Sequence, residues 1–278
     1  MKDELSTYAE NTWCPGCGNF GILNAFKRAI KVLEKKGMKN RIVISAGIGC
    51  HGKIFDYLNL SGVYSLHGRS VATVQGIKIA NPELKTVTFV GDGDALGEGI
   101  AHLIFAAKRN TDITVIMHDN GVYALTTGQF TPTSQKGFKS KSSPEGNIEE
   151  PLNPITLMLE SGANFVARGY SGKLQHLSDL MIQAIQHEGF SFIDVLQPCV
   201  SFNNTYQFYN KRVEEIDHDL TYEEAIELAR TKEKIAIGIF YRGKKPVYHK
   251  QLYRDWNPME KRIERRKRLK ILNEILGD

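Results

Sequence analysis

The sequence has no apolar run as long as the roughly 18 residues that a membrane-spanning helix requires. Its first four residues, Met1 to Glu4, also lack the apolar region of a signal peptide. We therefore expect a cytoplasmic protein with no membrane association. No internal repeat is visible, which argues against solenoid and propeller architectures.

Cysteine is scarce, with only four residues in 278: Cys14, Cys17, Cys50 and Cys199. A cytoplasmic chain keeps its thiols reduced, so these cysteines indicate metal binding or catalysis rather than disulfides. Structural zinc usually uses two local pairs of ligands, whereas this chain has one local pair and two distant single cysteines. The pattern favours a [4Fe–4S] cluster held by four thiolates. Zinc and unrelated buried cysteines remain the alternatives from the residues alone.

An excess of one charge is confined to a short segment near the C-terminus. The formal net charge is +5, and residues 261–270 carry seven basic residues and one acidic residue, a net +6. The remainder is about neutral, which argues against a broad nucleic-acid-binding face. Residues 258–276 are predicted to form a basic helix that is packed by a narrow apolar stripe, or that docks on a partner subunit or an acidic electron carrier. The stripe consists of Ile263, Leu269, Leu272 and Leu276.

What is present is a regular alternation of strand and helix patterns, in a composition typical of globular proteins. Strands are predicted over residues 41–46, 63–66, 86–90, 113–117, 164–167 and 190–196. Helices are predicted over residues 20–33, 71–80, 97–108, 155–161 and 174–187. This order predicts an α/β fold, an open and mostly parallel sheet flanked by helices. We place that domain at residues 1–199 and a C-terminal extension at 200–278, with a helix at 220–231 and a strand at 235–241.

A Gly-Asp-Gly turn at residues 91–93 follows the predicted strand 86–90. Such a turn lets backbone N–H groups approach a phosphate, with a helix N-terminus behind them. Asp92 and, at the end of the next strand, Asn120 are hard oxygen ligands that suit Mg²⁺. Both residue types are also common in ordinary turns, but here each closes a strand and one crossover helix joins the two strands. Asp94 either caps the following helix or approaches the diphosphate.

The Gly-Asp-Gly turn followed by Asn120 resembles the thiamine diphosphate (TPP) motif. Further motifs, in matching order, resemble the β subunit of the 2-oxoacid:ferredoxin oxidoreductases over roughly residues 8–215. They are Trp-Cys-Pro-Gly-Cys-Gly at 13–18, Gly-Ile-Gly-Cys at 47–50, His-Gly-Arg at 67–69 and Tyr-Ala-Leu-Thr at 123–126. The chain departs from the family pattern at Ala124, at Thr127 and in the loop 70–75, which concerns substrate selectivity and loop closure.

The resemblance implies oxidative decarboxylation of a 2-oxoacid with coenzyme A to acyl-CoA and CO₂, with the electrons passed to ferredoxin. It implies TPP, Mg²⁺ and a [4Fe–4S] cluster as cofactors. The cluster ligands would be the four cysteines, and the magnesium ligands would be Asp92, Asn120 and the backbone carbonyl of Val122. The implied cofactor contacts are Ile48, Gly49, Cys50, His67, Gly68, Gly91, Asp92, Gly93, Asp94, Asn120, Val122, Tyr123 and Leu125.

Two residues are candidates for substrate contact. Lys53 lies three positions after Cys50, and we expect it to bind a substrate carboxylate, although most lysines are simply solvated. His67 is either a satisfied core histidine or a contact to phosphate or substrate. In the family that it resembles, the matching position lies close to the cofactor.

TPP enzymes also need a glutamate at the aminopyrimidine ring, supplied by a second domain of related fold. This chain holds one such domain, so we expect an α subunit, or α and γ subunits, to carry the pyrimidine-binding domain and the catalytic glutamate. A non-redox TPP-dependent decarboxylase or synthase with structural cysteines is the alternative enzyme, and a cluster carrier is the non-enzymatic one. The sequence does not choose between pyruvate, 2-oxoglutarate and branched-chain oxoacids.

Overall fold

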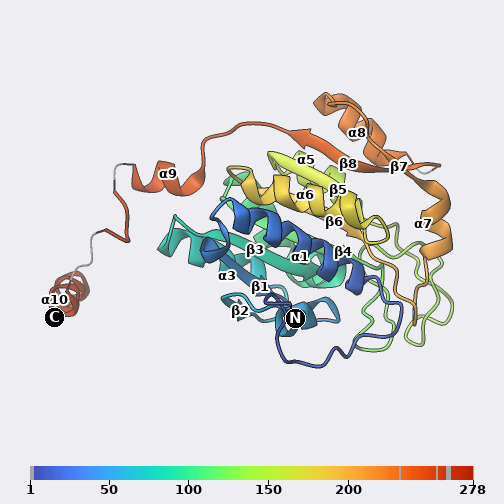
Figure 1. Ribbon diagram of the computed structural model, residues 1–278, viewed down its shortest axis with the longest axis horizontal. Helices are drawn as coiled ribbons and strands as arrows, with labels where there is room; N and C mark the ends of the chain where they lie inside the picture. Colours follow the sequence, from blue (N-terminus) through green and yellow to red (C-terminus); the bar gives the residue numbers. More distant parts are fainter. Residues whose placement is uncertain (1–2, 232, 255, 261–263, 278) are drawn as a thin grey trace.

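One eight-stranded sheet, in the order β2-β1-β3-β4-β6-β5-β8-β7, organises the described residues (Figure 1). The computed structural model describes residues 3–231, 233–254, 256–260 and 264–277. Neighbouring strands run parallel except β5 and β8, which are antiparallel, so the predicted open and mostly parallel α/β sheet is confirmed. The strands are β1 Ile42–Ala46, β2 Gly62–Tyr64, β3 Lys85–Gly91, β4 Ile113–Asp119, β5 Phe165–Tyr170, β6 Ser191–Leu196, β7 Val213–Glu215 and β8 Ile235–Arg242.

Helices cover both faces of the sheet, as crossover connections between parallel strands require. Helices α1 and α6 pack on one face, and α3, α4, α5 and α8 pack on the other. The α-helices are α1 Asn19–Lys35, α2 Ile54–Tyr57, α3 Ser70–Ala80, α4 Ile100–Lys108, α5 Pro154–Glu160, α6 Leu174–Gln186, α7 Tyr206–Arg212, α8 Tyr222–Arg230, α9 Tyr248–Tyr253 and α10 Arg265–Leu276. Short helical turns are η1 Lys39–Arg41, η2 His51–Lys53 and the π-helical η3 Gly93–Glu98. Across the described residues, none of the helices combines the length and apolar character needed to cross a bilayer.

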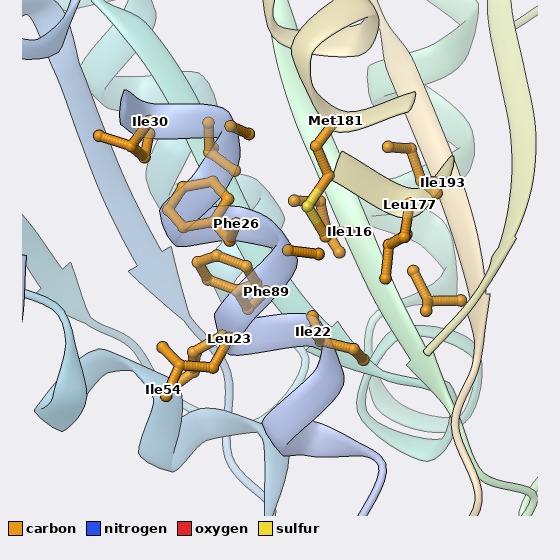
Figure 2. Close-up of a cluster of buried hydrophobic side chains, with 14 of the residues drawn as sticks. Ile22, Leu23, Phe26, Ile30, Ile54, Phe89, Ile116, Leu177, Met181 and Ile193 are labelled. Atoms are coloured by element: carbon orange, nitrogen blue, oxygen red, sulfur yellow. The ribbon is translucent and has the colours of Figure 1, made fainter. Parts of the chain in front are cut away.

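The larger core forms where α1 and α6 lie against the sheet (Figure 2). Phe26 of α1 meets Phe89 of β3 edge-to-face, with ring centroids 4.9 Å apart. Along β4, Ile116 points into this core, whereas Val115 points to the opposite face, as the two-residue period of a strand dictates. Helix α1 ends at Lys35, and Gly37 follows two residues later with a positive φ of 72° that permits the left-handed turn there.

Several short elements were not predicted, namely α2, α7, α9 and β7. Helix α7 is the clearest case, because the aromatic and amide-rich segment 203–210 shows no helical hydrophobic pattern. Its Tyr206 and Tyr209 instead pack against Tyr170 of β5 and neighbouring apolar residues. A helix this short depends on such tertiary contacts rather than on intrinsic propensity. The predicted crossover helix 97–108 also differs, because η3 begins at Gly93 and Gly99 separates it from α4.

The segment after Cys199 continues the sheet, because β8 pairs with β5 and β7 pairs with β8. The predicted C-terminal basic helix is observed from Arg265 onwards, and Ile263 of its stripe lies outside the described residues. Every residue of α10 is exposed, and the helix stands away from the sheet (Figure 1). The division of the chain at residues 199 and 200 stays a prediction.

We expect Phe26→Ala to lower the free energy of unfolding by about 3–5 kcal/mol, because it removes a fully buried ring between α1 and the sheet. Val32→Ala is the matched control on the exposed side of the same helix, with an expected change within about 0.5 kcal/mol. Urea unfolding of the full chain, followed by circular dichroism, measures both. Equal losses for the two variants would contradict this account of the core.

Candidate functional site

Two adjoining cavities lie beyond the carboxyl-terminal ends of β1, β3, β4 and β6, the edge where open parallel sheets bind ligands. The first cavity, of about 130 Å³, contains the turn at residues 91–93. The second, of about 200 Å³, is lined by all four cysteines and is called the cysteine cavity below. The two cavities share a wall made of Cys50, Asn120, Ala124 and Leu125.

Two glycines at and behind the first cavity are required by close side-chain packing. A Cβ atom placed on Gly93 would lie 2.2 Å from the ring of Tyr123, and one on Gly47 would lie 1.9 Å from a carboxylate oxygen of Asp94. Side chains therefore crowd these two positions so closely that only glycine fits. The ring of Tyr123 therefore packs directly on the backbone of Gly93 at the cavity wall, and the carboxylate of Asp94 packs on Gly47 behind it.

Asp92 is buried, and its carboxylate is held by the loop that follows β4. Its Oδ2 accepts hydrogen bonds from the hydroxyls of Thr131 at 2.5 Å and Thr133 at 2.7 Å. The Thr133 hydroxyl also lies 2.8 Å from Oδ1 of Asp119. One hydroxyl carries one proton, so Thr133 cannot donate fully to both carboxylates at once. Burial, with Asp194 and Asp92 nearby, raises the pKa of Asp119 well above its usual value.

Asn120 is oriented by two hydrogen bonds. Its Oδ1 accepts from the backbone N–H of Val122 at 3.0 Å, and its Nδ2 donates to Oε1 of Gln197 at 3.0 Å. The amide oxygen keeps one lone pair. Among the described residues, no hydrogen bond reaches the carbonyl of Val122. Asp92, Asn120 and Val122 all line the first cavity, so the three residues meet at one site.

Asp94 joins the loops after β1 and β2 to the turn after β3. One carboxylate oxygen lies 3.0 Å from Nδ1 of His67 and accepts the N–H of Gly68 at 2.8 Å, and the other lies 3.4 Å from Nε2 of His51. Burial opposes the negative charge, but His51, Gly68 and His67 together lower the pKa of Asp94 below its usual value. Asp94 therefore serves these loops, and no side-chain cap is formed at the start of η3.

The cysteine cavity brings together four free thiols from three separate parts of the chain. Burial raises the pKa of Cys17 to about 11, and the neighbouring thiols of Cys199, Cys50 and Cys14 add to the rise. Burial also raises the pKa of Cys50. Within the described ranges, no three His, Cys, Asp or Glu side chains are close enough together to hold a single metal ion. The thiols therefore border a volume rather than converge on one point.

Polar side chains from the loop after β6 reach two of these thiols. The hydroxyl of Ser201 donates to Sγ of Cys14 at 3.2 Å, and Nε2 of Gln197 donates to Sγ of Cys17 at 3.6 Å. No sequence motif singled out Gln197, Ser201, His51 or Thr133. The sequence offered only their positions as a signal. Gln197 and Ser201 lie beside Cys199, His51 follows Cys50, and Thr133 lies in the long polar loop.

The structure places most of the predicted contact residues around the first cavity. Gly68 does not line it but donates its N–H to Asp94. Lys53 lines the cysteine cavity instead, and its ammonium donates to the hydroxyl of Thr12 at 3.0 Å. Residues of the predicted set that line the first cavity are Ile48, Gly49, Cys50, His67, Gly91, Asp92, Gly93, Asp94, Asn120, Val122, Tyr123 and Leu125. Their roles as ligands and contacts stay predictions.

Two family models and several known proteins match the sequence of this chain. Residues 47–195 match the family model of the thiamine pyrophosphate enzymes, C-terminal TPP binding domain. Residues 199–254 match the model of the C-terminal part of the pyruvate ferredoxin oxidoreductase β chain. The protein is 44% identical to the 2-oxoacid:ferredoxin oxidoreductase subunit beta of a Sulfolobus species, over 96% of this chain and 95% of that one. It is 40% identical to the 2-oxoglutarate synthase subunit KorB of Archaeoglobus fulgidus, over 72% and 75% of the two chains.

A solved structure agrees with these relatives. The 2-oxoglutarate:ferredoxin oxidoreductase from Magnetococcus marinus, with 2-oxoglutarate, coenzyme A and succinyl-CoA bound, superposes with a TM-score of 0.85. The two chains are 34% identical, and the match covers 100% of this chain and 91% of the other.

The raised pKa of Cys17 predicts slow alkylation of the reduced, metal-free chain. With a pKa of about 11, the reactive thiolate is a minor species at neutral pH and increases about tenfold with each pH unit below that value. We expect the rate of iodoacetamide labelling at Cys17 to rise from about pH 8 to about pH 10 without a plateau. Mass spectrometry with fragment ions that separate Cys17 from Cys14 measures it, and a plateau below about pH 9 would refute the expectation.

Proposed function

The chain belongs to the family of 2-oxoacid:ferredoxin oxidoreductase β subunits, and on that premise we propose its chemistry. With a partner subunit it would decarboxylate a 2-oxoacid oxidatively, form acyl-CoA from coenzyme A, and pass the electrons to ferredoxin. The observation that carries the proposal is the shared wall between the first cavity and the cysteine cavity. Cofactors in two cavities that share Cys50 and Asn120 would be close enough to exchange electrons.

The first cavity suits a diphosphate bridged by Mg²⁺. The turn at residues 91–93 would offer backbone N–H groups to phosphate oxygens, and Asp92, the Asn120 amide and the Val122 carbonyl would supply one carboxylate and two neutral oxygens. Bound TPP would provide the nucleophilic carbon and the electron sink for decarboxylation. The protein's own part is positional, because the two threonine hydroxyls hold Asp92 in a single orientation.

The cysteine cavity suits a [4Fe–4S] cluster better than zinc. A zinc ion would need all four sulfurs at about 2.3 Å from one centre, an arrangement that the thiols do not approach among the described residues. A cluster occupies a volume, with one thiolate on each corner iron. Cys14, Cys17, Cys50 and Cys199 all line one cavity, which supports this ligand set.

His67 and Lys53 would contact the substrate or cofactor. When Nδ1–H of His67 donates to Asp94, its Nε2 is left as an acceptor on a half-exposed ring at the first cavity. Lys53 stands at the neighbouring cavity with its ammonium held by Thr12, from where it could bind a substrate carboxylate.

We further propose that an α subunit, or α and γ subunits, completes the site with the pyrimidine-binding domain and the catalytic glutamate. Apolar side chains near the first cavity remain exposed, 73% for Leu66 and 48% for Leu125, and would be covered by that partner. The extension 200–278 would pack on the same partner through α10, whose exposed Leu269 and Leu272 accompany a basic N-terminal half.

The function is tested by anaerobic co-purification of the chain with its partner. We expect iron, a reducible paramagnetic signal, TPP binding and CoA-dependent oxidation of 2-oxoacids that reduces ferredoxin. Cys199→Ser should lose the cluster and retain TPP binding. Asp92→Ala should lose TPP binding and retain the cluster. Absence of iron would favour a non-redox TPP enzyme, and absence of TPP binding would favour a cluster carrier. Full activity of the chain alone would refute the partner-supplied glutamate.

Truncation after residue 260 tests the docking role of α10. No residue of α10 is buried, so the truncated chain should unfold at the same temperature as the full chain. Its dissociation constant for the partner should rise about tenfold or more, equivalent to about 1.4 kcal/mol. Sedimentation of the chain together with its partner measures this, with Lys36→Glu on the exposed end of α1 as the control. Unchanged affinity would exclude α10 from the interface.

A further inference from the structure

Gln197 lies where the two cavities meet, and neither its sequence context nor the family motifs point to it. It directly follows β6, and only 1% of its surface is exposed. Its backbone N–H donates to the carbonyl of Asp119 at 2.8 Å, which continues the pairing of β6 with β4. Its side chain lines the cysteine cavity.

The three hydrogen bonds of this side chain allow only one orientation of its amide. Oε1 accepts from Nδ2 of Asn120, while Nε2 donates to the carbonyl of Pro198 at 2.7 Å and to Sγ of Cys17 at 3.6 Å. A rotation that exchanges the oxygen and nitrogen would oppose two NH₂ groups at Asn120 and two oxygens at Pro198. Both amide hydrogens of Gln197 are therefore committed, and so is its acceptor.

This orientation decides which atom Asn120 turns toward the first cavity. Its NH₂ group is bound to Gln197, so its oxygen is the atom that faces Val122 and remains available. Without that acceptor, only the N–H of Val122 would oppose a rotation of the Asn120 amide that presents its NH₂ group, which cannot bind a cation. Gln197 does not line the first cavity, so its effect there would act through Asn120.

The hydrogen bond from Gln197 to Cys17 acts in the cysteine cavity. Hydrogen bonds to ligating sulfurs are among the determinants of the reduction potential of an iron–sulfur cluster. An N–H group near a thiolate stabilises negative charge, and the reduced cluster carries one more negative charge than the oxidised one. A donor to Cys17 therefore favours reduction, and the effect is strong where both groups are buried.

We propose that Gln197 is a positioning residue that couples the two centres: it orients the oxygen of Asn120 toward Mg²⁺ and donates a hydrogen bond to Cys17 that raises the potential of the cluster. The proposal rests on the proposed function. It assigns to one buried amide both the affinity for TPP with Mg²⁺ and the ease with which the neighbouring cluster accepts an electron.

The test uses the anaerobically purified complex with its partner. Gln197→Met keeps the length of the side chain and removes both polar contacts. We expect the dissociation constant for TPP in the presence of Mg²⁺, measured by calorimetry, to rise about tenfold or more. We also expect the equilibrium constant for one-electron reduction of the cluster to fall about tenfold, which is about 59 mV in a titration followed by electron paramagnetic resonance.

Two control variants separate the two effects. Ser201→Ala removes the hydroxyl donor to Cys14 without touching Asn120, so it should lower the cluster potential and leave TPP affinity unchanged. Gln175→Met, on the exposed face of α6, should change neither quantity, because Gln175 bonds only to surface side chains. If Gln197→Met does not assemble a cluster, Gln197→Glu replaces it as the test variant. This substitution keeps an acceptor for Asn120 and removes the donor to Cys17. We expect a lower cluster potential with retained TPP affinity.

The outcomes are distinct from those that test the proposed function. A wild-type complex without an iron signal or without TPP binding refutes the proposed function itself. A wild-type complex with both, together with a Gln197→Met variant in which either the TPP affinity or the potential is unchanged, overturns the role assigned to Gln197.

Discussion

The parallel pairing of β3, β4 and β6 is the constraint on which the site depends. Gly91 pairs with His118, and Asp119 pairs with Leu196. The next residues, Asp92, Asn120 and Gln197, therefore leave the sheet at the same edge. Parallel strands that end in register bring together residues far apart in the sequence, and no single loop could place them so.

Burial of acidic groups at this edge has a cost that the structure offsets locally. Asp92 and Asp194 are buried and Asp119 is partly buried, and the loss of solvation raises the pKa of each. Asp194 is neutralised by an ion pair with Arg168 at 3.0 Å, while Asp92 and Asp119 share the hydroxyl of Thr133. In a medium of low polarity such groups need partners, which explains why a long polar loop is drawn into the site.

The loop at residues 130–154 was predicted from the sequence in its existence but not in its contacts. The length and composition of residues 130–154 predict a functional loop, and they form neither a strand nor a helix before Pro154. Composition could not reveal that Thr131 and Thr133 point at Asp92, because their contacts join residues about forty positions apart. Similarly, nothing local distinguishes Gln197 from an ordinary residue that follows a strand.

The sequence by itself determined the alternation of strands and helices, the Gly-Asp-Gly turn with Asn120, and the four cysteines, because hydrophobic period and residue chemistry are local properties. Tertiary structure alone decided that the two cavities share a wall, that Asp94 bonds to His67 and Gly68 rather than capping a helix, and that Gln197 bridges Asn120 and Cys17. Those outcomes depend on the register of strands that are distant in the chain, and register is set by the packing of the whole sheet.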